Sequence, residues 1–226
     1  KFGSIGFPAG NSETLVPYLW YQSTGAMLRD DNDEPILEQE KLSVLFSAIA
    51  ENRTAGNFSS SLRQYTSAAE AIEAFSNGQV TSLISWSSSM QPNSDEIGLS
   101  FIPALSDAPY TYADGWVWCL VQKETSDIER NIDFMQHLVS QTFLSQWTPE
   151  SDFLPVRQSS VLAMNYDQEF LDELLMSADV IPSENTLSAS KGVLFEELNA
   201  LLAGEISPEV GVENVLMQFE EGQNSD

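Results

Sequence analysis

Apolar residues recur at helical spacing along several segments of the chain. The clearest stripe follows the acidic run "DDNDEP" and consists of Leu42, Leu45, Phe46 and Ile49. We expect a helix whose first turn holds Pro35, with the acidic residues at its N-terminus, because acids favour the positive end of a helix dipole. The same run lacks the glycine and the distal glutamate of an EF-hand, so a solvated helix N-terminus explains it better than a calcium loop.

Capping boxes, in which a serine and a later glutamate cap a helix N-terminus, mark two further helices. Ser67 and Glu70 stand in "SAAE", ahead of a helix that ends at "NG". Ser126 and Glu129 stand in "SDIE", ahead of an amphipathic stripe that ends near Trp147. Other helices are predicted in "SETLVPYLWYQSTGAML", around "QEFLDELLM", around "VLFEELNALLAG" and from "SPE" onward.

Short apolar runs between these helices are typical of strands. They are "FGSIGF", "VTSLIS", "IGLSFIPAL" and "WVWCLVQ". The last is continuously apolar, which is typical of a strand buried on both faces, and Cys119 within it is predicted to be a buried thiol. Strands mixed with amphipathic helices indicate the α/β class.

Composition and charge exclude several functions. The chain has 226 residues, of which 42% are apolar, enough for one large domain or two small ones. It carries 34 acidic against 9 basic residues, a net charge of −25, which argues against nucleic-acid partners and against docking on anionic lipid. The single cysteine cannot form an intramolecular disulfide or a cysteine metal cluster. No apolar run reaches the length of a transmembrane helix.

Catalytic motifs do not stand out in the sequence. There is no nucleophile elbow, no metalloprotease motif and no phosphate loop. His137 is the only histidine, so it cannot build a triad or a two-histidine metal site alone, and we assign it to a helix surface. We therefore predict no enzyme activity, no cofactor and no metal. A glycosidase-like pair of carboxylates stays open as an alternative, because acidic residues are abundant.

The stretch "EAIEAFSNGQVTSLISW", residues 70–86, resembles a hallmark of extracellular solute-binding proteins, in the sugar-binding, maltose-binding-like family of ABC importers. Further motifs agree with it in order: "STGAML" before "DDND", "IGLSFIPAL", "ADGWVWCLVQ" before a helix that runs into a tryptophan, "LP", and "LNALLAGEISPEVGVENVL". The resemblance implies a periplasmic-binding-protein-like class II lobe, a mixed sheet flanked by helices, with a segment of a second lobe.

The resemblance also implies a division of the chain. Residues 1–105 plus 156–226 would form the C-terminal ligand-binding lobe, and residues 106–155 a crossover segment belonging to the N-terminal lobe. The rest of that lobe, and the lipoprotein signal of the family, would precede Lys1. The family's location is extracellular, either as a membrane-anchored lipoprotein or in the periplasm.

Ligands of doubly wound sheets lie beyond the carboxyl ends of the strands, where Trp86 follows "VTSLIS". Its ring can stack on the apolar face of a sugar, although a tryptophan at a strand end can equally plug a core. By resemblance, the ligand-binding residues are Glu13, Tyr18, Trp86, Asp114, Gly115, Trp116 and Lys191. For Glu13 the alternative is an acid at a helix N-terminus, and for Trp116 it is a core residue. Trp20, Trp118 and Trp147 are assigned to packing.

The function implied is the solute-binding component of an ABC importer. It would bind a small carbohydrate between two lobes by hinge closure and would deliver it to a membrane permease. A sensor or surface glycan-binding module with the same fold is the first alternative, and a glycan-active enzyme is the second. Without the missing N-terminal lobe, we expect these residues to bind sugar very weakly and either to self-associate, because the apolar run "WVWCLV" presents a sticky edge, or to need the missing segment.

Overall fold

The computed structural model describes residues 4–58, 61–89, 97–106, 108–121, 127–151, 153–161, 167–188 and 190–223. Within those residues the protein is a mixed α/β structure with about 54% helix and small sheets. Contacts divide the chain into two compact units: unit 1 comprises residues 1–85, 101–112 and 177–226, and unit 2 comprises residues 86–100 and 113–176. The predicted α/β class is confirmed, whereas the periplasmic-binding-protein arrangement stays a prediction.

The boundaries of the two units differ from the predicted segments. Residues 86–100 and 156–176 belong to unit 2, and residues 106–112 belong to unit 1. The assignment of 1–105 plus 156–226 to a ligand-binding lobe, and of 106–155 to a crossover segment, stays a prediction.

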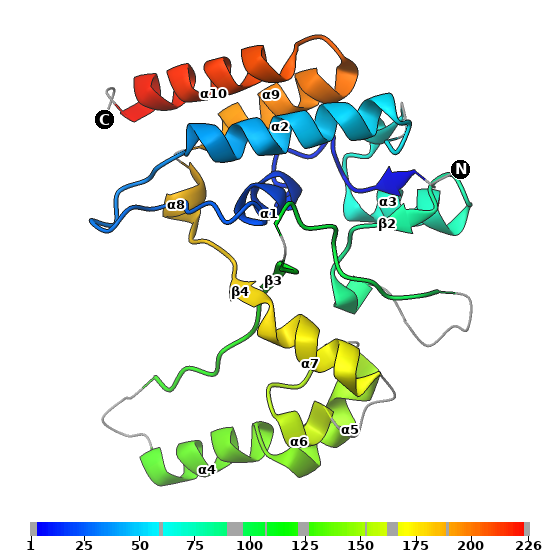
Figure 1. Ribbon diagram of the computed structural model, residues 1–226. Helices are drawn as coiled ribbons and strands as arrows, with labels where there is room; N and C mark the ends of the chain where they lie inside the picture. The colour runs from blue at the N-terminus through cyan, green and yellow to red at the C-terminus, as the bar shows by residue number, and fades with distance from the viewer. Residues whose placement is uncertain are drawn as a thin grey trace. The chain divides into compact units, whose positions relative to one another are not determined.

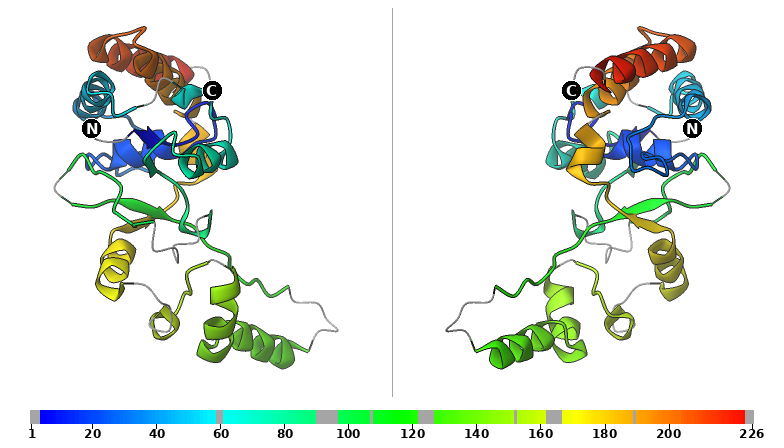
Figure 2. Two further views of the ribbon diagram at one scale, coloured as in Figure 1. Left: turned by 90° about the vertical axis from the view of Figure 1, so that its right-hand side faces the viewer. Right: turned by 90° about the vertical axis from the view of Figure 1, so that its left-hand side faces the viewer.

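Helices make up most of unit 1 (Figure 1). Their bounds are α1 Val16–Gln22, α2 Gln39–Thr54, α3 Ala68–Ser76, α8 Glu184–Ser188, α9 Lys191–Ala203 and α10 Pro208–Gln223, with a 3-10 turn at Leu62–Gln64. Helices α2, α9 and α10 pack side by side (Figures 1 and 2). The predicted apolar stripe of α2 is confirmed, because Leu42, Leu45 and Phe46 are each 0% exposed and Ile49 is buried beside them.

The acidic run before α2 forms a turn rather than the first turn of the helix. The Asp30 carboxylate accepts the backbone N–H groups of Asn32 and Glu34 at 2.8 and 2.9 Å, which lowers the Asp30 pKa. Pro35 pairs with Arg29 in an isolated antiparallel bridge. The prediction that Pro35 lies in the first helical turn is therefore wrong, because side-chain-to-backbone hydrogen bonds of this kind compete with helix formation.

The capping box of α3 is confirmed. The Ser67 hydroxyl accepts the backbone N–H of Glu70 at 3.3 Å, and the Glu70 carboxylate reaches back to accept the N–H of Thr66 at 2.6 Å. The hydrogen bonds from the Thr66 N–H and hydroxyl to the ionised carboxylate lower the pKa of Glu70. The helix ends just before Gly78, which adopts a positive φ of 69°.

The strands are short. In unit 1, β1 (Ile5–Gly6) pairs in parallel with β2 (Ser82–Leu83), as the runs "FGSIGF" and "VTSLIS" predict. A second pair joins β3 (Thr111–Ala113) to β4 (Ala178–Val180). The run "IGLSFIPAL", predicted as a strand, takes no part in either pair over residues 97–105. It contains a glycine and a proline, and a proline cannot donate to a strand ladder.

Unit 2 is also mainly helical. Its helices are α4 Ile128–Leu138, α5 Gln141–Ser151, α6 Gln158–Val161 and α7 Gln168–Met176, with a 3-10 turn at Ser87–Ser89. The predicted helix of "SDIE" begins as α4, but it ends at Leu138, and Trp147 lies in the separate helix α5, so the single helix expected here is wrong. Asp127 caps α4 and accepts the backbone N–H of Arg130 at 3.1 Å. The predicted cap, Ser126, lies outside the described residues. His137 is exposed on α4, as predicted.

The run "WVWCLV" is not a buried strand. Residues 116–121 have no strand pairing, Trp116 and Val117 are 87% and 82% exposed, and Trp118 and Cys119 are also exposed. The predictions of a buried strand, a buried thiol and a packed Trp118 are therefore wrong for this structure. Burial on both faces requires neighbouring strands, and the described residues supply none to this run.

The tryptophans assigned to packing therefore differ in their surroundings. Trp20 is 5% exposed and meets Phe7 edge to face at 5.2 Å between ring centroids, as predicted for a core residue. Trp147 on α5 is 45% exposed, but its ring stacks parallel to those of Phe143 and Phe153, each at 6.4 Å.

Candidate functional site

Trp86 follows β2 along the chain and directly precedes the serine turn Ser87–Ser89, which is closed by a 3.0 Å hydrogen bond from the Ser89 N–H to the Trp86 carbonyl. Its side chain is 43% exposed. The alternative of a core plug is thus excluded for this structure. The ring is available to a ligand, although ligand contact itself stays a prediction.

The predicted residues of "ADGW" lie in an open, extended segment. The Asp114 carboxylate accepts the N–H of its neighbour Gly115 at 2.8 Å, and no described residue approaches within 4 Å of a Cβ placed at Gly115. Trp116 is not the core residue that its alternative describes, because it is the most exposed tryptophan among those described. These side chains are therefore accessible but not gathered in a pocket.

The predicted residues of unit 1 have different environments. Glu13 is exposed ahead of α1. Tyr18 is 2% exposed, and its hydroxyl donates to the Leu187 carbonyl and accepts from Ser190, both at 3.4 Å, while burial raises its pKa to about 12. The ring of Tyr18 therefore belongs to the core. Lys191 begins α9, and its side chain lies outside the described part of the structure.

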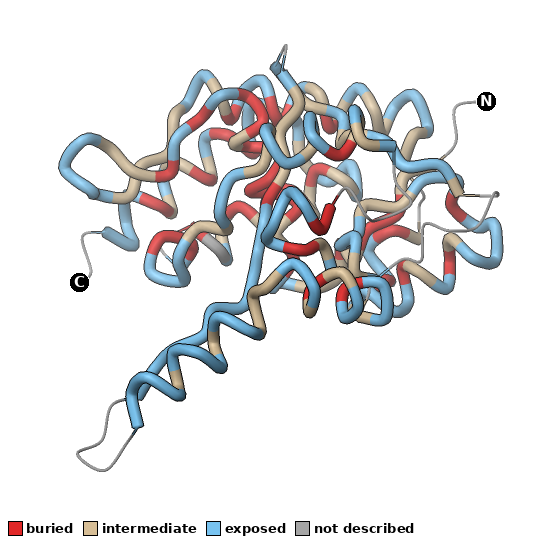
Figure 3. The backbone as a smooth tube through the Cα atoms, turned by 90° about the horizontal axis from the view of Figure 1, so that it is seen from below, coloured by how far each residue is buried: buried red, intermediate tan, exposed pale blue. Residues whose placement is uncertain are grey.

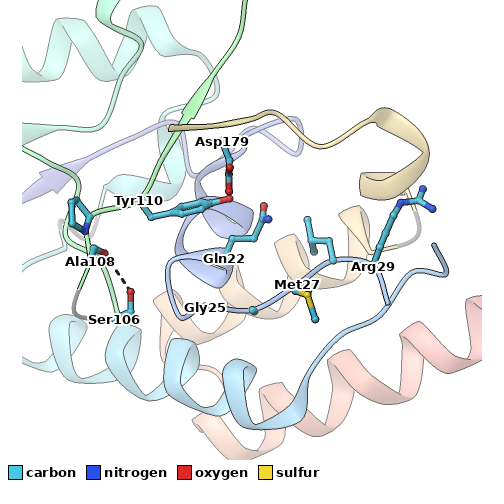
Figure 4. A pocket seen from close by; sticks show the side chains of 11 residues that line it. Gln22, Gly25, Met27, Arg29, Ser106, Ala108, Tyr110 and Asp179 are labelled. Carbon is cyan, nitrogen blue, oxygen red and sulfur yellow. Dashed lines mark hydrogen bonds between the residues drawn. The ribbon is translucent and has the colours of Figure 1, made fainter. Parts of the chain in front are cut away.

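A pocket of about 370 Å³ lies wholly within unit 1 (Figure 4). Its walls come from three segments: the turn after α1, which Gly25 allows by adopting a φ of 79°, the loop that leads into β3, and β4. The lining residues are Gln22, Gly25, Ala26, Met27, Leu28, Arg29, Ser106, Ala108, Pro109, Tyr110 and Asp179. None of the residues predicted from the sequence lines it.

Tyrosines support the polar side of this pocket. The Tyr112 hydroxyl donates to the Gln22 side-chain oxygen, and the Tyr110 and Tyr112 rings meet edge to face at 5.7 Å. The Tyr110 hydroxyl points toward the Asp179 carboxylate (Figure 4), yet it is buried and completes no hydrogen bond with a described residue. Burial, followed by the nearby Asp179 charge, raises the pKa of Tyr110, so the phenol stays protonated.

Arg29 is engaged away from the pocket. Its Nε donates to the Thr186 hydroxyl at 2.8 Å, and its Nη1 lies 3.3 Å from Oδ1 of Asp33, whose carbonyl oxygen also accepts from it. Asp179 is exposed, and no ion pair with it is found among the described residues. Asp179 is therefore the uncompensated charge of the lining.

A second, smaller pocket of about 190 Å³ lies in unit 2, between the run 116–121 and α4. It is lined by Trp118, Cys119, Leu120, Asn131, Phe134, Met135 and Leu138. This lining contains no charged side chain, so it can offer a ligand mainly apolar contact.

Sequence reasoning missed Gln22, Tyr110 and Asp179. Gly25 signals the turn after α1, and "APY" signals a loop before β3. Nothing in the pattern places Asp179 next to Tyr110, because the two are joined only by the pairing of β3 with β4.

Among the described residues no group of histidine, cysteine, aspartate and glutamate side chains is arranged to hold a metal ion. The described helices are each too short or too polar to cross a membrane. A comparison with models of known protein families finds no match, and a search among curated proteins finds no similar sequence.

Proposed function

We propose that this chain is a non-catalytic binding protein that captures a small carbohydrate outside the cell for an ABC importer. The observation that carries the proposal is the exposed indole of Trp86, which follows a strand of a parallel pair after Ile84 and Ser85 and directly precedes three serines. In α/β proteins this end of the strands is where ligands bind.

The chemistry of these residues suits a sugar. A flat indole offers an apolar face to the C–H groups of a pyranose. Ser87, Ser88 and Ser89 bring hydroxyls that donate and accept hydrogen bonds, as sugar hydroxyls require. Asp114 would add a carboxylate that accepts from hydroxyls when the segment closes on the ligand. A membrane permease would then receive the sugar.

The proposal is tested by titrating mono- and oligosaccharides, up to high millimolar concentration because weak binding is expected, into the 226-residue chain and monitoring binding by calorimetry and NMR. Trp86→Ala should weaken sugar binding by roughly ten- to a hundredfold, because the loss of one stacking face costs about 1–3 kcal/mol. Trp147→Ala is the matched control, since Trp147 is 45% exposed against 43% for Trp86 and also belongs to unit 2.

Equal losses in both variants would show that the tryptophans act through stability alone, and would contradict the proposal. Consumption of the sugar during the titration would instead establish the alternative of a glycan-active enzyme. Sugar binding that is unaffected by Trp86→Ala would move the site elsewhere on the molecule.

A further inference from the structure

The unit 1 pocket has a charge pattern that a neutral sugar does not require. Asp179 contributes a carboxylate without an ion pair among the described residues, whereas the Arg29 guanidinium is held by Asp33 and Thr186. The whole chain carries a net charge of −25, which raises the local concentration of cations near its surface. An anionic ligand is disfavoured in this pocket for the same reasons.

The remaining groups of the pocket fit a small molecule with one polar end. The Tyr110 hydroxyl is buried, points toward the Asp179 carboxylate and completes no hydrogen bond with a described residue, so its oxygen has lone pairs to accept. The Gln22 side-chain oxygen already accepts from Tyr112. Met27, which is 56% exposed, and Pro109 contribute apolar surface to the lining. The Tyr110 ring adds an aromatic surface that attracts cations.

We propose that this pocket binds a small organic cation, an alkylammonium, with its charged end at Asp179 and Tyr110 and its alkyl chain along Met27 and Pro109. The ammonium N–H groups donate to the Asp179 carboxylate and to the Tyr110 hydroxyl oxygen. This site shares no residue with the carbohydrate site proposed at Trp86, and it goes beyond that function.

The test compares three probes of equal chain length on the 226-residue protein by NMR titration: butylammonium, 1-butanol and butyrate. Butylammonium should bind about tenfold or more tightly than either of the others, and its affinity should fall as salt is added. The Gln22 side-chain amide signal should shift during the titration. Equal affinity for butanol and butylammonium, or no binding of butylammonium, would overturn the proposal.

Variants locate the binding. Asp179→Asn keeps the shape and removes the charge, and it should weaken butylammonium binding about tenfold. Glu73→Gln makes the same change of charge at an exposed position of α3 outside the pocket, and it should leave the affinity within about twofold. Equal effects of these two variants would show that only the net charge matters, and would overturn the site.

Tyr110→Phe separates a ligand role from a structural one. Among the described residues its hydroxyl completes no hydrogen bond, so the thermal midpoint should change little, while butylammonium binding should weaken about two- to fivefold. A Tyr110→Phe variant that loses stability and keeps its affinity would contradict the contact between the ammonium group and the Tyr110 hydroxyl.

Glucose is a second competitor. If glucose competes with butylammonium in wild type and loses binding in Asp179→Asn, the pocket takes a polyol instead. Trp86→Ala should leave butylammonium binding unchanged, so failure at one site does not decide the other.

Discussion

Unit 1 buries the apolar faces of its long helices, whereas unit 2 leaves the apolar face of α4 in solvent. In α2, Leu42, Leu45 and Phe46 are each 0% exposed under α9 and α10. In α4 no residue is buried, and Phe134 is 60% exposed; in Figure 3 buried positions cluster in the helices of unit 1. The comparison shows that an amphipathic helix can form in both units, while burial depends on what packs against it.

The energetic consequence is uneven stability. Full burial of a leucine or phenylalanine side chain stabilises a fold by about 1.5–3 kcal/mol relative to exposure. Unit 1 gains this many times over, while α4 and the run 116–121 of unit 2 gain little of it. We therefore expect unit 2 to open locally at lower free energy than unit 1.

The largest expected difference between the units comes from a matched pair of truncations. Phe46→Ala should lower the free energy of unfolding by about 3–5 kcal/mol, because it leaves a cavity among α2, α9 and α10. Phe134→Ala removes the same atoms from an exposed site and should change it by no more than about 0.5 kcal/mol. Urea unfolding monitored by circular dichroism measures the free energy of unfolding of both variants. Equal losses would mean that α4 is buried in solution, and the contrast between the units would be wrong.

The sequence predicts most of the longer helices of both units, but it misplaces two strands, and it predicts the environment of only one unit. The stripe of α2 and the box at Ser67 are local patterns, and local patterns determine where helices begin and which face is apolar. The run "WVWCLV" has an equally clear pattern, but its burial depends on neighbouring strands, and sequence periodicity contains no information about whether they are present. Cys119 and Trp118 were misplaced for that reason.

The next effect concerns the contact between α10 and α2. A Cβ at Gly211 would lie 2.4 Å from the Phe46 ring, whereas no described atom lies within 4 Å of a Cβ at Gly222 in the same helix. Gly211→Ala should therefore destabilise unit 1 by about 1–3 kcal/mol through overpacking. Gly222→Ala should be neutral or slightly stabilising, since alanine favours helix. The thermal midpoints of the two variants test this prediction. A Gly211→Ala variant as stable as wild type would show that Phe46 can move to make room for the added methyl group.

The candidate sites show the same limit of sequence reasoning. Trp86 could be singled out because the strand, the aromatic residue and the polar turn are consecutive in the chain. The unit 1 pocket could not be, because Gln22, Tyr110 and Asp179 come from segments far apart in sequence. Their meeting depends on the β3–β4 pair, whose strands of three residues are too short for a period to be recognised.

Helix caps give a smaller test of the same contrast. Ser67→Ala removes the cap of α3 and should lower the global free energy of unfolding by about 1 kcal/mol. Asp127→Ala removes the cap of α4, and because α4 has no buried residue, its effect should be local. Amide hydrogen exchange should accelerate in α4 without a change in the global unfolding midpoint. If Asp127→Ala lowered the global free energy of unfolding as much as Ser67→Ala does, the conclusion that α4 unfolds locally would be contradicted.

The smallest effect is the pH dependence that Glu70 gives to unit 1. Its carboxylate accepts the Thr66 backbone N–H at 2.6 Å and the Thr66 hydroxyl at 2.9 Å, so its pKa in the folded protein is lowered from the ordinary 4.5. The unfolded chain then binds the proton more tightly, so this stabilisation is present above pH 4.5 and is lost as pH falls through the folded pKa. Glu70→Gln should be less stable than wild type near neutral pH, and this difference should shrink in acid.

Thr66→Val tests the cause of the pKa shift. It removes the Thr66 hydroxyl but keeps the backbone N–H, which is the largest cause of the shift, so the Glu70 pKa measured by NMR should rise only part of the way to 4.5. A complete return in Thr66→Val would assign the shift to the hydroxyl, and the capping geometry of α3 would need revision.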